Sequence, residues 1–314
     1  PMRHLLKLTT TFALALVLTA GMAFGQNSAD VNQNGDENDA TLEQVFQGPE
    51  GENKAFIDQN GDNNEVRRYG QRGSGNLLDI DQDGDRNVVE PWPEQGETSG
   101  RSHLGETDID QLGDDNTVWD ADQEGYSNYS QVLQEGNGNF ADIEAQVNPG
   151  GGEGTGNSVS ITQTSDGNLI GTTDGNTGFF QYGQGNEATL TQEAGGGNAI
   201  GTQAVSNAPN APVLGQSGQS GGAASEQGFV QVGSDNVATA IQSGSGNVVE
   251  YGLQEGSGNV LNVTQTGANH SARFSQVGSM NDLTLDQTGA GHDAHIFQTG
   301  SGNTANVTQS SGGN

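Results

Sequence analysis

Apolar and polar side chains alternate along several short stretches of this chain. In NVLNVTQ, residues 259–265, every second side chain from the asparagine onward falls on one face of an extended strand, so Leu261 and Val263 share that face. About four residues containing Gly separate such stretches, a composition typical of tight turns that need positive φ. The pattern therefore predicts a repeated strand and turn. The same alternation occurs in residues 186–192, 281–287 and 303–309.

This alternation returns with a fixed period in the last part of the chain. From Gln254 to Gln309, a Gln recurs every 11 residues. A Gly follows each of the first five by two positions, and an Asn or His follows by five. A period of this kind indicates a repeat architecture rather than a compositional bias.

Two such units are expected to form one coil of about 22 residues, with a strand on each of two facing sheets. Stacked coils would pair each strand with its counterparts above and below at about 4.8 Å, as in cross-β structures. The sequence therefore predicts an all-β fold, a β-solenoid of stacked strand-turn-strand coils with an amyloid-like cross-β arrangement.

Inward Gln and Asn are costly to bury alone, but amides stacked in register can donate to and accept from their neighbours. We expect a ladder of stacked side chains at Gln181, Asn186, Gln192, Gln231, Asn236, Gln242, Asn247, Gln254, Asn259, Gln265, His270, Gln276, Asn281, Gln287, His292, Gln298, Asn303 and Gln309. We expect turns at Gly183, Gly233, Gly244, Gly256, Gly267, Gly278, Gly289 and Gly300.

Weaker copies extend the repeat upstream to about Gln33, which suggests about 10 coils. The period breaks at residues 91–102, 148–157 and 204–224, where Pro and Gly favour loops between coils. The predicted organisation is a signal peptide (1–25), an acidic repeat half (26–157), further repeats (158–203), an insertion rich in Pro, Gly and Ser (204–224), regular 11-residue units (225–309) and a tail (310–314). The upstream Gln and Asn pairs are Gln33/Asn38, Gln59/Asn64, Gln71/Asn76, Gln82/Asn87, Gln111/Asn116, Gln123/Asn128 and Gln134/Asn139.

Composition narrows the functional classes. The 314 residues include 40 acidic and 9 basic side chains, a net charge of -31, which argues against nucleic acid and anionic membranes as partners. Only about 19% of the residues are Leu, Ile, Val or Phe, so without the repeat the chain would be expected to be disordered. There is no Cys, which excludes disulfides and thiolate metal sites.

Charge also differs between the two halves. Residues 30–153 hold 29 acidic side chains, whereas only 11 follow from Ile161 onward, where Arg273 is the sole basic residue. Like charges stacked about 5 Å apart repel. We therefore expect the acidic half to restrain self-association and the regular half to assemble quickly.

The first residues have the layout of a secretory signal. Arg3 and Lys7 precede an apolar run at residues 12–18, and small residues surround Phe24. We expect cleavage before Gln26 and an exported mature chain without a membrane-inserted segment.

Residues 181–192 (QYGQGNEATLTQ) and 298–309 (QTGSGNTANVTQ) both fit the pattern QxGxGNxAxxxQ. This pattern resembles the curlin repeat of bacterial curli fibre subunits. The resemblance implies a functional amyloid that is secreted through dedicated outer-membrane export machinery and forms homopolymeric fibres at the cell surface. These fibres belong to the biofilm matrix, mediate adhesion and aggregation, and start from a nucleator subunit. Two departures are the missing Gly-rich leader and the scarcity of the Ser that precedes Gln231 as Ser225. Whether the chain is a major subunit or a nucleator stays open.

Two features of the sequence could indicate a binding site instead of a repeat position. Residues 79–90 (DIDQDGDRNVVE) satisfy the calcium-loop pattern of an EF-hand, but Gln82, Gly84 and Asn87 occupy repeat positions, which predicts strands there. Weaker calcium binding by stacked acidic turns remains an alternative. His270 and His292 should stack as a neutral pair, with a metal or pH-sensing role as the alternative.

No constellation of acid, base and nucleophile indicates catalysis, and neither a cofactor nor a metal site is expected. The competing function is a soluble β-solenoid that acts as an adhesin or ligand-binding module. Its stack would end in caps, whereas a polymerising stack leaves its end strands open.

Overall fold

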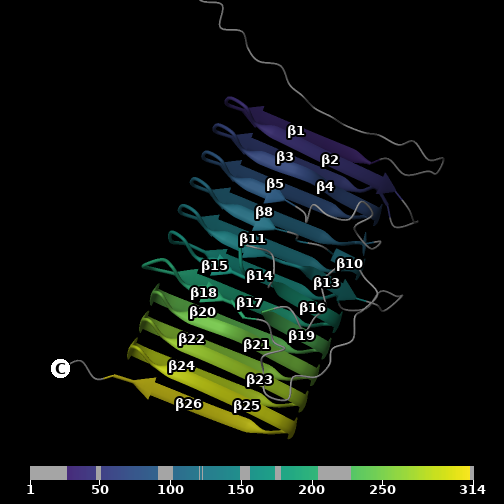
Figure 1. Cartoon of the computed structure of the whole chain (residues 1–314). Coiled ribbons are helices and arrows are strands. Elements are labelled where there is room, and N and C mark those ends of the chain that lie inside the picture. The colour runs from purple at the N-terminus through teal and green to yellow at the C-terminus, as the bar shows by residue number, and fades with distance from the viewer. Residues whose placement is uncertain are drawn as a thin grey trace, which may run out of the picture.

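The computed structural model is a stack of β-coils that follow one another in chain order (Figure 1). It describes residues 27–46, 51–90, 102–119, 121, 123–148, 156–173, 178–203 and 228–311. All paired strands are parallel, and none of the described residues is helical, so the predicted β-solenoid is confirmed. No helix in these ranges is long and apolar enough to cross a membrane. The predicted signal and most of the three predicted breaks lie outside the described ranges.

Each coil places one strand in a first sheet and its continuation in a second sheet. The first sheet has 11 uninterrupted strands. They are β1 (Ser28–Asn34), β3 (Lys54–Asn60), β5 (Leu77–Asp83), β8 (Glu106–Leu112), β11 (Tyr129–Glu135), β14 (Ser158–Gln163), β17 (Glu187–Glu193), β20 (Val237–Ser245), β22 (Val260–Ala268), β24 (Asp282–Ala290) and β26 (Thr304–Ser310).

The second sheet has 15 strands, because several coils cross it as two fragments. Its strands are β2 (Asp39–Phe46), β4 (Glu65–Ser74), β6 (Val88–Glu90), β7 (Ser102–His103), β9 (Thr117–Trp119), β10 (Gln123–Tyr126), β12 (Phe140–Asp142), β13 (Ala145–Asn148), β15 (Leu169–Ile170), β16 (Phe179–Gln184), β18 (Ala199–Ile200), β19 (Phe229–Ser234), β21 (Val248–Ser257), β23 (Ser271–Ser279) and β25 (Asp293–Ser301).

The coils differ in length more than the 11-residue unit predicts. Gln265 and Gln287 occupy equivalent places on successive coils and are 22 residues apart, as expected. The equivalent separation is 29 residues from Gln82 to Gln111 and 50 from Gln192 to Gln242. The extra residues of these longer coils fall where the second sheet is fragmented, between β6 and β7 and between β18 and β19, so the first sheet keeps its register.

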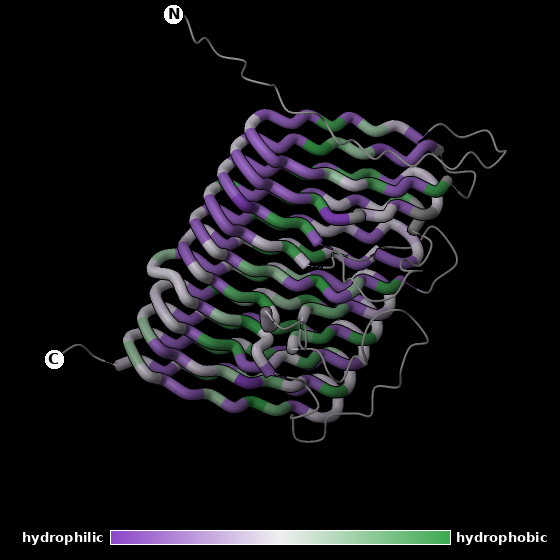
Figure 2. The backbone as a smooth tube through the Cα atoms, turned by 45° about the horizontal axis from the view of Figure 1, so that its top comes forward, coloured by the Kyte–Doolittle hydropathy of each residue, from purple (hydrophilic) through white to green (hydrophobic). Residues whose placement is uncertain are grey.

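A thin apolar core fills the space between the two sheets. The alternation places side chains such as Ile80, Ile109 and Leu190 of the first sheet inside, where they are fully buried. The second sheet contributes Phe179 and Phe229, whose ring centroids lie 5.7 Å apart on neighbouring coils. Burying one such side chain stabilises the fold by about 1.5 to 3 kcal/mol, so a short apolar pair in each strand can hold a coil against its neighbours. The alternation of hydrophobic and hydrophilic positions along each strand can be followed in Figure 2.

Candidate functional site: amide columns and glycine turns

Glutamine side chains form an unbroken column inside the first sheet. Each Nε2 donates to the Oε1 of the next glutamine, for example from Gln111 to Gln134 at 2.9 Å and from Gln134 to Gln163 at 2.9 Å. We call this the first-sheet glutamine column. It comprises Gln33, Gln59, Gln82, Gln111, Gln134, Gln163, Gln192, Gln242, Gln265, Gln287 and Gln309.

A second-sheet glutamine column runs in the same direction. Gln181 donates to Gln231 at 2.7 Å and Gln231 to Gln254 at 2.7 Å. Residues 91–101, which lie between Gln71 and Gln123 in the sequence, are outside the described ranges. Its described members are Gln44, Gln71, Gln123, Gln146, Gln181, Gln231, Gln254, Gln276 and Gln298.

Apart from Gln33, each column glutamine also donates its Nε2 to a backbone carbonyl of the opposite sheet. Gln265 Nε2 also donates to the carbonyl of Val248 at 3.2 Å, and Gln254 Nε2 to that of Val237 at 3.0 Å. The glutamines therefore tie the carbonyl of the first residue of a strand to the opposite sheet. This double use explains why a fully buried amide is tolerated at these positions.

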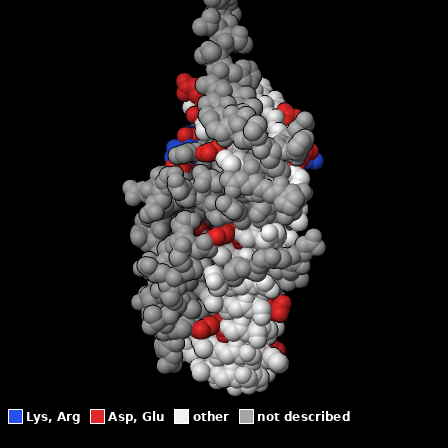
Figure 3. All heavy atoms as spheres, turned by 90° about the vertical axis from the view of Figure 1, so that its right-hand side faces the viewer, with Lys and Arg blue, Asp and Glu red and all other residues white. Residues whose placement is uncertain are grey.

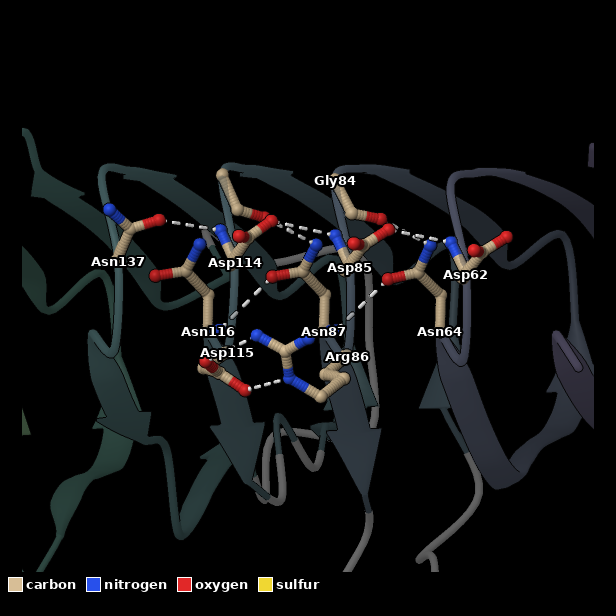
Figure 4. Close-up of polar contacts among 11 residues, drawn as sticks. Asp62, Asn64, Gly84, Asp85, Arg86, Asn87, Asp114, Asp115, Asn116 and Asn137 are labelled. Carbon is tan, nitrogen blue, oxygen red and sulfur yellow. Dashed lines mark hydrogen bonds and ion pairs between the residues drawn. The ribbon is translucent and has the colours of Figure 1, made fainter. Parts of the chain in front are cut away.

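Asparagine side chains connect the coils at both turns. Asn64 Oδ1 accepts the backbone N–H of Asn87 at 2.9 Å, while Asn64 Nδ2 donates to the carbonyl of Gly84 at 2.7 Å (Figure 4). We call the residues before the second-sheet strands the second-sheet asparagine column. It contains Asn38, Asn64, Asn87, Asn116, Asn139, Asn168, Asn198 and Asn247, followed by His270 and His292.

A matching first-sheet asparagine column precedes the first-sheet strands. Asn281 Oδ1 accepts the N–H of Asn303 at 3.1 Å, and Asn281 Nδ2 donates to the carbonyl of Gly300 at 3.0 Å. Its other described asparagines are Asn53, Asn76, Asn128, Asn157, Asn186, Asn236 and Asn259.

Every predicted ladder residue lies in one of these four columns. The sequence pattern required a Gly two positions after each Gln. It therefore did not identify several column members that lack this Gly. Gln146 is followed there by Asn148, and Gln163 by Ser165. Asn168, five positions after Gln163, was not identified for the same reason, and Asn157 was not identified because it ends the stretch 148–157 that was predicted to be a loop.

The turns after the strands need glycine for steric reasons. Gly84 has φ +128°, and a Cβ there would lie 2.1 Å from the carbonyl oxygen of Gly113 on the next coil. A side chain would therefore separate the coils. All eight predicted turn glycines, from Gly183 to Gly300, have positive φ.

The turn that contains Gly84 also carries an acidic row. Asp85 Oδ1 accepts the backbone N–H of Asp62 at 2.8 Å, and Asp114 Oδ1 that of Asp85 at 2.9 Å (Figure 4). Arg86 pairs with Asp115 on the next coil at 2.6 Å, and this hydrogen bond holds the pKa of Asp115 below its usual range. Ordinary side-chain contacts thus stack the acidic turns.

A curlin-associated repeat model matches residues 113–144, 256–289 and 281–310 of the chain. These segments contain the glutamine, turn and asparagine positions described above. The chain is a curlin-repeat protein. A search of curated proteins found no match. Proteins with curlin repeats are structural subunits, and the columns are what the repeat pattern encodes in this member.

The curlin-repeat protein also carries an acidic outer face on the first sheet. Asp79 and Asp81 of β5 lie beside Asp108 and Asp110 of β8 in the parallel register. Burial, followed by the neighbouring carboxylates, raises the pKa of Asp79, Asp81 and Asp110 above the usual range. The equivalent position of Asp81 in β24 is Asp286, which pairs with Thr264 and Thr308 instead. The like charges are therefore concentrated in the N-terminal coils.

Figure 3 shows the side of the curlin-repeat protein that lies at the right in Figure 1. Lys and Arg on its described surface gather toward the N-terminal part of the stack, whereas the described surface near the other end shows only a few acidic groups. Arg67 pairs with Glu90 and Arg273 with Glu250 on adjacent coils, whereas Lys54 pairs with Glu52 two residues away.

The calcium-loop match in the curlin-repeat protein lies on strands. Residues 79–90 form the end of β5, the turn at Gly84 and then β6, which confirms the strand interpretation over an EF-hand. Within the ranges that the structure describes, no group of three or more His, Asp or Glu is arranged to hold a metal ion.

Proposed function

We propose that this protein is a secreted structural subunit that self-assembles end to end into curli-like functional amyloid fibres of the extracellular biofilm matrix. In this role it mediates adhesion and aggregation at the bacterial cell surface and has no enzymatic activity. The observation that carries the proposal concerns β1 and β26, the end strands of the first sheet: among the described residues no strand pairs with the outer edge of either one, and the two edges match one another.

The open edge of β26 repeats the edge that β24 offers to it. Asp282 N–H donates to Asn303 O, and Ser311 N–H donates to Thr288 O, so odd-numbered backbone groups of β26 face β24. Backbone groups alternate in direction along a parallel strand. Those of Thr304, Asn306 and Thr308 therefore face away from the stack.

The open edge of β1 is complementary. Ser28 N–H donates to Asn53 O, and Asn34 O accepts from Gly61 N–H, so even-numbered backbone groups of β1 face inward. Those of Ala29, Val31 and Gln33 face outward. Placing β1 of a second copy on β26 would continue the ladder in the internal register, and unpaired edges of this kind are templates for strand addition.

The glutamine columns support the same contact between β26 of one copy and β1 of the next. In the two glutamine columns every hydrogen bond between glutamines runs from Nε2 to the glutamine of the following coil, which leaves Gln33 Oε1 as an acceptor at one end of the first-sheet column and the Gln309 amide as a donor at the other. A head-to-tail contact would let Gln309 donate to Gln33 of the next copy, as Gln287 donates to Gln309 at 2.7 Å. A head-to-head contact would oppose two acceptors or two donors.

The partners follow from the curlin family rather than from the geometry. We propose a homopolymer that starts from a nucleator subunit and reaches the surface through dedicated outer-membrane export machinery. The net charge of -31 supports neither nucleic acid nor an anionic membrane as a partner.

The test uses a proline at the open edge. Asn306→Pro removes an N–H that faces away from β24, so the stack should fold, while addition of the next copy should lose a ladder bond and meet the proline ring. Asn306→Ala keeps that N–H and is the matched control. We expect Asn306→Pro to remain monomeric by light scattering while the wild type and Asn306→Ala form fibres.

Equal fibre formation by all three proteins would contradict joining through β26. A wild type that stays monomeric over the same period would contradict fibre assembly itself and favour the soluble adhesin.

A further inference from the structure

The second-sheet asparagine column ends in two histidines. His270 follows β22 and His292 follows β24, one coil further along. Their rings are stacked, with centroids 5.2 Å apart and planes 3° apart. His270 is buried, whereas His292 is only partly buried at the end of the described stack.

The hydrogen bonds of His270 define its protonation state. Nδ1 accepts the backbone N–H of His292 at 3.3 Å, so it carries no proton. Nε2 lies 3.1 Å from the carbonyl oxygen of Thr266, which can only accept, so Nε2 carries the proton. The ring in this arrangement is neutral. His292 Nε2 makes the same contact with Thr288 O at 3.1 Å, which leaves its Nδ1 free to accept from the next layer.

The histidines hold the coils together less securely than the asparagines they replace. Asn198 Nδ2 donates along the stack to Gly244 O at 2.9 Å, and Asn247 Nδ2 to Gly267 O. The contacts of the imidazole Nε2 atoms are within their own turns. On this edge, coil-to-coil hydrogen bonding by the side chain depends on the Nδ1 lone pair alone.

A proton on Nδ1 would remove that contact. It would turn the acceptor into a donor that faces the N–H of His292, and it would place two cations in rings 5.2 Å apart. Histidine is the side chain that ordinarily changes charge between about pH 5 and 8. The opposite edge of the same coils is held by Asn259, Asn281 and Asn303, which do not titrate in this range.

The carboxylates near the pair have other bonding partners or lie on another face. Asp293 of β25 pairs with His295 at 3.2 Å, and Glu250 of β21 pairs with Arg273 of β23. Asp286 of β24 lies on the outer face of the first sheet. None of these carboxylates makes a hydrogen bond to either imidazole among the described residues.

We propose that His270 and His292 make the end of the stack formed by β25 and β26 a proton-gated docking surface for a second copy of the chain. With both rings neutral, the last coil is held flat against its neighbour and presents a continuous edge. With the rings protonated, the turn at residues 289–292 separates from the turn that contains His270 on the preceding coil. The outer edge of β26 then no longer matches β1 of the incoming copy. This inference rests on the proposed end-to-end assembly.

The first test compares seeded elongation of the full chain at about pH 7.5 and about pH 5.5, across the range in which histidine titrates. The variant His270→Asn/His292→Asn restores the asparagine column, and His295→Asn removes the exterior histidine as a control. We expect the wild type and His295→Asn to elongate about tenfold more slowly at the lower pH, the factor that corresponds to about 1.4 kcal/mol. The double variant should keep its rate within about twofold.

If elongation of the wild type and of the double variant depended on pH to the same extent, the proposed role of the histidines would be overturned. Titration of the carboxylates would then account for the pH dependence. Absence of elongation in every protein at the higher pH would instead contradict the proposed assembly.

A second measurement needs only the wild type. Hydrogen exchange of the soluble chain should show that the backbone N–H of His292 loses protection at the lower pH. The N–H of Asn303, which Asn281 Oδ1 accepts at 3.1 Å in the same coil, should keep its protection. If each amide had the same protection at both pH values, the proposal would be overturned. This measurement does not depend on whether the double variant folds.

Discussion

Gln265 donates its amide to Gln287 at 2.8 Å on the next coil, and both side chains are fully buried. Gln265 also accepts from Gln242 at 2.8 Å, so one residue ties three coils together. The relationship recurs along the whole first sheet and gives a thin core its specificity, because a shift of one residue would leave every amide without its partner.

Gln265→Leu should therefore destabilise the stack although it adds apolar surface. The substitution strands the Gln242 donor, the Gln287 acceptor and the Val248 carbonyl, and each unsatisfied group costs about 1 to 3 kcal/mol. Thr264→Leu, on the outer face of the same strand, is the matched control. Chemical denaturation of the soluble chain should show a clearly lower free energy of unfolding for Gln265→Leu. Equal losses in the two variants would mean that the amide column contributes no specific stability.

Gly84→Ala should destabilise the chain much more than Gly138→Ala. Both glycines have positive φ, but a Cβ at Gly84 would lie 2.1 Å from the carbonyl oxygen of Gly113, whereas Gly138 has open space around it. Backbone strain costs each variant about 1 to 3 kcal/mol, and only Gly84→Ala adds a clash of similar size. Thermal unfolding measures the difference. An equal shift in midpoint for both would show that neighbouring turns are not in close contact.

Millimolar calcium should not induce helix in this protein. Asp79, Asp81 and Asp83 lie on β5, and the turn that follows is held by stacked backbone and side-chain contacts. Circular dichroism with and without calcium checks this, with magnesium as the control cation. A rise in helical signal specific to calcium would show that residues 79–90 can leave their strands.

Asp81→Asn should stabilise the chain at neutral pH and speed its assembly. The pKa of Asp81 is raised first by burial and then by Asp58 and Asp83. A carboxyl group with a raised folded-state pKa binds its proton more tightly in the folded chain, so the free energy of unfolding rises as the pH falls through that pKa. The gain at neutral pH should be less than about 1 kcal/mol, because exposed charges are screened.

Asp286→Asn is the matched control for this prediction, since its neighbours in the equivalent column are Thr264 and Thr308. Denaturation at about pH 7 and at about pH 4, near the ordinary carboxyl pKa, should show a smaller pH dependence of the free energy of unfolding for Asp81→Asn than for the wild type and Asp286→Asn. An unchanged pH dependence in Asp81→Asn would contradict the idea that the acidic coils restrain folding and assembly.

Sequence could predict the regular part of the stack because its signal is local. Between Gln254 and Gln309 the strand, the turn and the amide positions recur without insertion, so both the coil and its inward side chains follow from one period. Upstream, extra residues separate fragments of the second sheet along the chain, and members such as Gln163 lack the turn glycine. Which aspartates share the acidic face depends on pairing across unequal coils, as between Asp79 and Asp108, and no local pattern encodes that register.

Fibre diffraction of the purified wild-type chain tests the central claim most directly. If copies add end to end, aligned fibres grown at neutral pH should give a meridional reflection at about 4.8 Å and an equatorial reflection near 10 Å, the strand and sheet spacings of the stack. Asn306→Pro, treated identically, should give no fibres. A wild-type chain that remains monomeric, or fibres that lack the meridional reflection along their axis, would contradict the account.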